Sequence, residues 1–477
     1  MHGKKWGGLE WYNTGILRKE QEMAYNFVKV NREQMYLMPP SLREWVPQGE
    51  LPWFVLDAVE QMDMKAFYEG YRGDGWGHPA FEPKMMATLL VYAYCVGERS
   101  SRRIEKLCVR DVGFRVITAN QKPDHTVIAR FRQGNAKALE GLFVEVLKLC
   151  QKAGAVKVGV VALDGTKVKA NAALAANRSY EHIEGQVRKM LSEAAAKDAE
   201  EDALYGKERR GDELPEALKD RQSRLARLKA CKEQMEREAQ ETAAEQAQKI
   251  AARQAEEEAA GQKKRGRKPK EPDPTPPVEA KANVTDPQSR IMKTRTGFIQ
   301  GYNAQAVVGE GQVIVAAEVT QQETDVHQLH PMLQKAQENL KAVGTCEKIG
   351  AALSDAGYWS EANVLTAEPE TPELFIATTK DWKQRKAMRE QPPPRGRLPK
   401  AMSARDRMER KLLTRRGRAL YTMRGQMIEP VFGQVKEVRG CDRFQRRGYS
   451  AVQSEWRLIC ATHNLLKLWR SGKARWN

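Results

Sequence analysis

The chain has 477 residues, of which 41% are hydrophobic and 30% charged, and this composition excludes a fibrous or wholly disordered protein. No apolar run approaches the roughly 18 residues that a membrane-spanning helix needs, and the first residues lack the apolar core of a secretory signal. We therefore expect a cytoplasmic protein without a membrane partner. Seven cysteines with no C-x-x-C pair argue against a disulfide framework or zinc module and predict buried, reduced thiols.

The charge is strongly one-sided. Eighty basic residues against 62 acidic ones give a net charge of +18, and residues 401–477 alone hold 18 basic and 6 acidic residues, a net charge of +12. Solubilising surfaces usually mix both signs. A field this uneven favours a polyanionic partner, of which DNA or RNA is the commonest.

The first 153 residues have the pattern of a helical domain. Residues 83–97 are apolar on almost every side, which predicts a buried helix. Shorter helices are expected after Ser100 and after Asp124, the second with the basic sequence HTVIARFRQGN, and a helix at 137–153 closes the region. Most short helical hairpins bind no nucleic acid, but this arginine-rich series is compatible with a helix-turn-helix-like unit. We expect residues 1–153 to form a helical DNA-binding domain.

The pattern changes after residue 153. KVGVVALDG, at 157–165, is a β-branched run that predicts a fully buried strand. Residues 178–286 are rich in Ala, Glu, Lys, Gln and Arg, which predicts a long amphipathic helix or helix pair. This segment ends in a basic, proline-rich linker that cannot build a core. We expect residues 178–286 to be a helical insertion after the first strand of a domain.

Strand patterns resume after the insertion. Further strands are expected at 297–308, 312–320, 349–355 and 373–379. The first two are joined by Gly-Glu-Gly, a hairpin signal, and a helix at 331–343 precedes the third. This alternation predicts an α/β fold in which helices flank a mixed sheet. Residues 154–177 and 287–477 are therefore expected to form one domain.

Two of these strands end in aspartate, at Asp164 and Asp355. Ligands of open α/β sheets bind at the carboxyl ends of strands, so the two carboxylates converge if their strands are neighbours. At about 4 Å two such charges repel by roughly 4 kcal/mol at an effective dielectric near 20, which a shared proton or a divalent cation relieves. An all-oxygen site favours Mg²⁺ or Mn²⁺ over zinc. The alternative is that each aspartate is only a turn residue.

A third acid, Glu429, lies in an otherwise basic stretch with Tyr421, Arg424 and Lys436. Glu429 and Lys436 are seven residues apart, about 20° from the same helical face. An acid there can complete a metal site while the lysine holds a phosphate. Pro430 predicts a kink or the start of a helix. Alternatives to one of the three acids, each close to a predicted strand, are Asp286, Glu318 and Asp325.

Three motifs resemble one known family. They are DGTKVKANA around Asp164, LSDAGYW around Asp355 and Y-x2-R-x4-E-P-x-F-G-x2-K around Glu429. The chain resembles insertion-sequence transposases that have an RNase H-like catalytic domain and an Asp-Asp-Glu triad, in the branch with a Tyr-Arg-Glu-Lys signature. The segment from FEPKMMATLL to PDHTVIARFR is similar to that family's N-terminal domain. Here four residues separate Arg424 from Glu429, whereas the commonest form of the signature has three.

This resemblance implies an RNase H-like mixed sheet and a transposase that cleaves transposon ends and joins the 3′-OH to target DNA. It implies two Mg²⁺ or Mn²⁺ ions held by Asp164, Asp355 and Glu429. Tyr421, Arg424 and Lys436 would contact phosphates near the cut. The partner is double-stranded DNA, both terminal inverted repeats and target, and we expect a homodimer on DNA at the bacterial nucleoid.

Four further residues are candidates for contacts with DNA. Arg443, Arg446 and Arg447 are expected to face DNA and to steer it by charge. Trp359 either stacks on a flipped base while the second strand is cut or anchors a following helix, 360–366, in the core. Two other functions stay open, namely a DNA-binding regulator without catalysis and an RNase H-like nuclease that cuts without joining strands.

Overall fold

The computed structural model describes residues 41–474 except 72–78, 206–215, 262–269, 346, 367–370, 398 and 400. Within these ranges no helix combines the length and apolarity that crossing a membrane requires. The six cysteines they contain are free and buried, as the sequence predicts.

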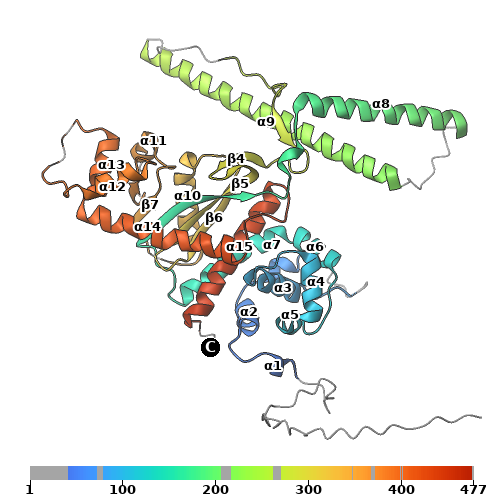
Figure 1. The fold of residues 1–477 in the computed structure, drawn as a ribbon, viewed down its shortest axis with the longest axis horizontal. Helices are drawn as coiled ribbons and strands as arrows, with labels where there is room; N and C mark the ends of the chain where they lie inside the picture. Colours follow the sequence, from blue (N-terminus) through green and yellow to red (C-terminus); the bar gives the residue numbers. More distant parts are fainter. Residues whose placement is uncertain are drawn as a thin grey trace, which may run out of the picture.

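The N-terminal part is helical (Figure 1). Its helices are α1 (Leu42–Trp45), α2 (Leu51–Glu60), α3 (Pro83–Cys95), α4 (Ser101–Arg110), α5 (Val112–Ile117), α6 (His125–Gly134) and α7 (Ala136–Lys152). Helix α3 is buried on nearly every side, as its apolar sequence predicts. Asp124 caps α6 by accepting the backbone N–H groups of Thr126 and Val127. Helices α4 and α6 pack against each other.

The main sheet is mixed, as predicted. Its strands are β1 (Val160–Lys169), β4 (Arg290–Thr294), β5 (Gly297–Gly309), β6 (Ile314–Thr320), β7 (Ala351–Ser354) and β8 (Glu373–Ile376). The order is β4-β5-β1-β7-β8, and β6 pairs with β5. The central strand β1 is antiparallel to β5 and parallel to β7, which is parallel to β8. Strand β1 continues to Lys169, beyond its apolar run, because β5 pairs with it along that whole length.

The remaining helices surround this sheet. They are α10 (Leu329–Ala342), α11 (Glu361–Leu365), α12 (Trp382–Glu390), α13 (Ala404–Leu413), α14 (Arg415–Gly433) and α15 (Tyr449–Ser471). A π-helical turn, Gln434–Val438, follows α14 directly. Short 3₁₀ turns lie at Lys65–Phe67, Leu174–Ala176 and Val326–Gln328.

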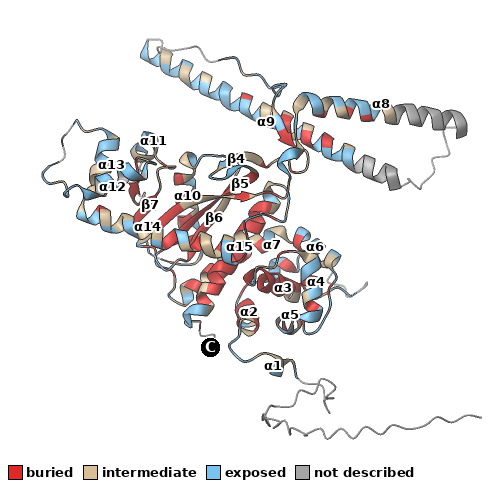
Figure 2. Cartoon of the chain, in the orientation of Figure 1, coloured by how far each residue is buried: buried red, intermediate tan, exposed pale blue. Residues whose placement is uncertain are grey.

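The insertion leaves the sheet and returns to it at one point. The strands β2 (Asn177–Ser179) and β3 (Lys281–Asn283) pair antiparallel. Between them α8 (Tyr180–Tyr205) and α9 (Glu216–Ala260) extend away from the sheet (Figure 1). The two helices have a small core of their own, formed by Ile183, Val187, Met190, Leu228, Cys231 and Met235. Most of their described surface is nevertheless exposed (Figure 2).

Helix α15 joins the sheet to the N-terminal helices. It packs against α7, α3 and β6, and its Trp456 is completely buried. Two polar side chains of α15 bond the backbone of β6: Asn464 pairs with both the N–H and the C=O of Ile314 at 2.8 Å, and Gln453 accepts the N–H of Val319 at 2.7 Å. These bonds satisfy backbone groups of β6 that its pairing with β5 does not use.

A buried ion pair holds the segment 439–448 between these parts. The Glu455 carboxylate on α15 accepts the backbone N–H groups of Gln445 and Arg446, at 3.0 and 2.9 Å. The Arg99 guanidinium, from the N-terminal helices, lies 3.4 Å from the same carboxylate and donates to the carbonyl of Gly440 at 2.7 Å. Both side chains are less than 10% exposed. The pair therefore fixes how α15, the N-terminal helices and this segment fit together.

Replacing Glu455 with alanine should lower the free energy of unfolding by about 3–5 kcal/mol, because Arg99 is then buried without its carboxylate. Chemical denaturation followed by circular dichroism measures this change. Glu258→Ala removes an exposed glutamate of α9 and serves as the control, with an expected change below about 0.5 kcal/mol. An equally small effect of Glu455→Ala would contradict the role given to the pair.

Candidate functional site

Asp164 and Asp355 lie at the same end of two neighbouring strands. Leu163 of β1 is in register with Ser354 of β7, and the two strands are parallel. Asp164 directly follows Leu163, and Asp355 directly follows Ser354. The structure therefore brings the two predicted aspartates together. Each also accepts a backbone N–H close by, Asp164 from Gly165 at 2.8 Å and Asp355 from Gly357 at 2.7 Å.

A third aspartate at this place is Asp325, from the segment between β6 and α10. Its Oδ1 accepts the side-chain amides of Asn303 and Gln305 on β5, each at 2.7 Å, and lies 3.8 Å from the ammonium of Lys167. A Cβ added at Gly357 would lie 2.9 Å from Asp355 Oδ1 and 3.2 Å from Asp325 Oδ2. Asp325 and Asp355 therefore flank the same glycine, and the sequence had offered Asp325 only as an alternative acid.

Only glycine fits at position 165, directly after Asp164, for a steric reason. A Cβ at Gly165 would lie 2.2 Å from Gln305 Nε2, 2.6 Å from Asp325 Oδ1 and 2.9 Å from Asn303 Oδ1. Those separations are far shorter than van der Waals contact, so any other residue would displace the amides that hold Asp325. The Asp-Gly pair in the motif thus serves the packing of three side chains from other strands and loops.

The electrostatics of Asp164 reflect this crowding. Burial raises the pKa of its carboxyl from 3.8 to about 7, and the nearby charges of Asp355 and Asp325 act in the same direction. The Arg424 guanidinium opposes them, because it forms an ion pair with Asp164 Oδ2. A buried carboxyl that retains its proton until neutral pH is one that an added positive charge would help to ionise.

Helix α14 carries three of the predicted site residues. Two of them contact the strand ends, whereas the third is exposed. Arg424 is paired with Asp164, and the Tyr421 hydroxyl donates to the carbonyl of Ser354 at 3.3 Å. Glu429 lies five residues after Arg424 on the same helix, and its side chain is exposed. Among the described residues no group of three acidic, histidine or cysteine side chains is arranged to hold a metal ion.

The helix continues through Pro430 instead of starting there. A proline inside a helix leaves the carbonyl four residues earlier, here that of Gln426, without its usual N–H donor. The side-chain amide of Gln312 donates to this carbonyl at 2.9 Å. The cost of the proline is thereby reduced, and α14 reaches Gly433 before the π-helical turn begins.

The oxygen atoms at this end of the sheet are of the chemical type that a hard divalent cation binds, although the described acidic side chains form no group of three around one point. Two buried oxygen atoms, Asn303 Oδ1 and Ser354 Oγ of the residue before Asp355, have no hydrogen-bond partner in the described structure. Carboxylate, amide and hydroxyl oxygens are the ligands that Mg²⁺ accepts. One oxygen of Asp164 is engaged by Arg424 instead.

Lys436 and Trp359 both make contacts within the fold. The Lys436 ammonium, on the π-helical turn, donates to Thr166 Oγ1 at 2.6 Å and to the carbonyl of Lys167 at 2.8 Å. Trp359 is half-buried and packs against the main core, next to the completely buried Tyr358. The helix after it, α11, is capped by Ser360, whose hydroxyl accepts the N–H of Asn363.

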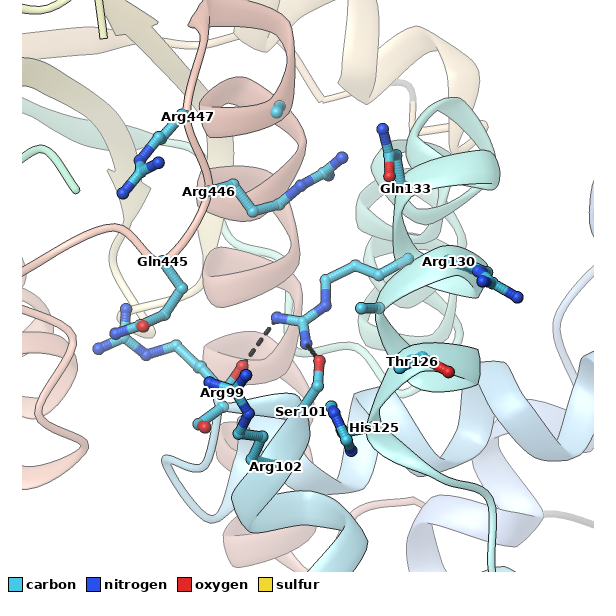
Figure 3. A pocket seen from close by; sticks show the side chains of 14 residues that line it. Arg99, Ser101, Arg102, His125, Thr126, Arg130, Gln133, Gln445, Arg446 and Arg447 are labelled. Carbon is cyan, nitrogen blue, oxygen red and sulfur yellow. Dashed lines mark hydrogen bonds between the residues drawn. The ribbon is translucent and has the colours of Figure 1, made fainter. Parts of the chain in front are cut away.

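The predicted tail arginines lie at two neighbouring hollows. Arg446 and Arg447 line a groove of about 800 Å³ between α4, α6 and α15 (Figure 3). Arg443 and Arg447 line a second hollow of about 540 Å³, together with Lys169 at the end of β1. The groove also contains Arg102 of α4 and Arg130, which lies in the basic helix expected after Asp124. The signal that could have found Arg130 is its position on one face of α6 with Thr126 and Gln133.

Two parts of the chain match known protein families. Residues 40–134 match the transposase domain family DUF772, and residues 383–469 match the transposase DDE domain family. The second match includes Tyr421, Arg424, Glu429 and Lys436, whereas Asp164 and Asp355 lie outside both. The chain matches neither a curated protein nor a solved structure.

The raised pKa of Asp164 predicts a pH effect on stability in the absence of metal. Between about pH 4 and pH 7 the folded protein holds a proton there that the unfolded chain has lost, so stability falls as pH rises through this window. Asp164→Asn cannot ionise. The stability of the unmodified protein relative to this variant should therefore fall by up to about 4 kcal/mol over that range. Urea denaturation in EDTA measures this, and a difference independent of pH would contradict it.

Proposed function

Because the chain belongs to the insertion-sequence DDE transposases, we propose that it cleaves transposon ends and joins the freed 3′-OH to target DNA by phosphoryl transfer at Asp164 and Asp355. The observation that carries this proposal is the convergence of the two aspartates at the ends of parallel strands, beneath a helix that carries Arg424 and Tyr421. Such a site offers oxygen ligands and a phosphate-binding cation side by side.

We propose an RNase H-like catalytic domain made of residues 154–177 and 287–477. A sheet with parallel strands β1, β7 and β8 next to the antiparallel strands β5 and β6 supports this assignment. Residues 178–286 would then be an insertion, which the closing pair of β2 and β3 supports. Residues 1–153 would be the DNA-binding domain.

Asp164 and Asp355 would hold the divalent ions, with Glu429 as the third acid by resemblance to the family and Asp325 as its alternative. When bound, two such ions activate the attacking oxygen and stabilise the leaving one. Asn303 and Gln305 keep the Asp325 carboxylate directed at this site. Arg424 places a positive charge beside the acids, and its guanidinium would bind a phosphate oxygen near the cut. Tyr421 and Lys436 would contact neighbouring phosphates.

Replacing Asp164 or Asp355 by its amide should reduce Mg²⁺-dependent cleavage and strand transfer by about a thousandfold or more, because several kcal/mol of transition-state stabilisation are lost. Binding of end DNA in EDTA should change little. Gel assays of nicked and joined products measure the activities, and Glu437→Gln, an exposed glutamate just past Glu429, is the matched control.

Comparison of Glu429→Gln with Asp325→Asn decides the third acid, since only the one that holds metal should cause the full loss. Cleavage without a joined product would identify a nuclease. DNA binding without any metal-dependent cleavage, unaffected by Asp164→Asn, would identify a regulator.

We also propose that Trp359 stacks on a flipped base while the second strand is cut. Stacking contributes roughly 1–3 kcal/mol, so Trp359→Ala should keep first-strand nicking and slow second-strand cleavage by about tenfold or more. A substrate that lacks the base to be flipped should restore part of the activity, because nothing then has to be unstacked. Equal loss of both cuts, or a variant that fails to fold, would show that Trp359 only anchors the core.

A further inference from the structure

The groove between the N-terminal helices and the tail has an unusual composition. Four of its arginines come from the N-terminal part, Arg99, Arg102, Arg130 and Arg132, and two from the tail, Arg446 and Arg447. None of the described residues that line it is acidic. Figure 3 shows one wall formed by α4 and α6 and the other by the segment around Arg446 and by α15. The chain therefore assembles concentrated positive charge from two regions that are more than 300 residues apart.

Two of the six arginines are occupied in holding the groove together. Arg99 is bound to Glu455 and to the carbonyl of Gly440. Arg132 is buried and donates to the carbonyl of Arg99 at 2.7 Å and to the hydroxyl of Ser101. These two side chains therefore bond the segment before α4 to α6 and to the tail, which holds the walls of the groove together.

Three other guanidinium groups have no acceptor among the described residues: those of Arg102, Arg130 and Arg446. Arg102 and Arg130 are exposed, but Arg446 is half-buried, and in Figure 3 its side chain extends across the groove toward Gln133 of α6. Burial lowers the pKa of Arg446 and Arg132 acts in the same direction, whereas Tyr94 and Glu455 oppose them without reversing the shift. A cation that is partly desolvated beside another cation is unfavourable by itself, and an anion in the groove would relieve it.

The shape favours a DNA backbone over a small anion. The groove is open along α6, on which Thr126, Arg130 and Gln133 lie on one face at spacings of four and three residues. A row of donors along a helix, faced by arginines on the opposite wall, suits a run of consecutive phosphates. Helix-turn-helix units hold DNA in this manner, with one helix along the duplex and neighbouring groups on the backbone.

We propose that this groove binds the phosphate backbone of double-stranded DNA at the transposon end, with the N-terminal helices and the tail segment 445–447 forming one site. The proposal deepens the proposed function and rests on it for the identity of the DNA. It adds that neither region is a complete binding site alone. Arg446, Arg102 and Arg130 are the phosphate ligands, and Arg99 and Arg132 position them.

The groove is also connected to the acidic site through β1. The backbone N–H of Lys169, the last residue of β1, donates to the carbonyl of Asp442 at 3.0 Å, and Phe444 donates back to Lys169 at 2.8 Å. Asp164 lies five residues earlier on the same strand, about 17 Å away at 3.3 Å per residue. The strand β1 therefore connects the segment 445–447 to Asp164, and DNA bound by this segment would lie at a defined distance from the aspartates.

The test is the salt dependence of DNA binding in EDTA, measured by fluorescence anisotropy with the full chain and a duplex that carries the DNA end flanking the gene. Each phosphate contact that is lost should make the slope of log K against log salt less steep by about 0.9. Arg446→Gln should therefore flatten the slope by about one, and the triple variant with Arg102→Gln and Arg130→Gln by about three. Arg103→Gln is the matched control, because Arg103 is exposed on α4, pairs with Glu98 and lies outside the groove.

An unchanged slope for the triple variant would overturn the proposal, as would an equal effect of Arg103→Gln. A change seen only with duplex RNA would overturn it too, because the occupant would then be another polyanion. If Arg446→Gln fails to fold, Arg102→Gln and Arg130→Gln still test the proposal. Both residues are exposed, and each substitution should also flatten the slope by about one. The experiment needs no catalysis. If the protein never cleaves DNA but its variants show the flattened slopes, the groove is confirmed as a DNA-binding site and the proposed function is wrong.

Discussion

The buried carboxylate of Glu455 is the interaction on which the arrangement of this molecule depends. Taking a carboxylate out of water costs several kcal/mol, which is offset only when all its hydrogen-bonding capacity is used. Its partners are two backbone N–H groups of the segment 439–448 and the guanidinium of Arg99. Helix α15, the N-terminal helices and the tail segment must therefore fold together. Because the same segment is bonded to the end of β1, the position of the sheet follows from this pair as well.

The sequence predicted what is encoded locally. Asp164 and Asp355 could be found because each ends a short apolar run of strand length, and the alternation of such runs with helical patterns predicted the mixed sheet. The third aspartate beside them could not be selected in this way. Asp325 joins the site because Asn303 and Gln305, some 20 residues earlier, direct their amides at it, and only the pairing of β5 with β1 puts those amides next to Gly165.

Other differences also arise from distant partners. Pro430 predicted a kink or the start of a helix, but the side chain of Gln312, from the β5–β6 hairpin, compensates for the missing hydrogen bond and the helix continues. The apolar pattern of β1 ends near Gly165, yet the strand extends to Lys169 because β5 pairs with it. The groove was invisible in the sequence because its walls come from opposite ends of the chain. Charge counting indicated the tail and the basic helix pattern indicated the N-terminal half, but nothing in the sequence joined the two.

The bonds between α15 and β6 also affect whether copies of this protein aggregate through the edge of the sheet. An outer strand with free amides and carbonyls invites a strand from another molecule, which leads to sheet-to-sheet aggregation. Here Asn464 and Gln453 take up backbone bonds of β6 that such a strand would need. Where copies of the chain are concentrated, this flank of the sheet therefore offers them no adhesive edge. Contacts between copies at this flank must then form through side chains instead of hydrogen bonds between strands.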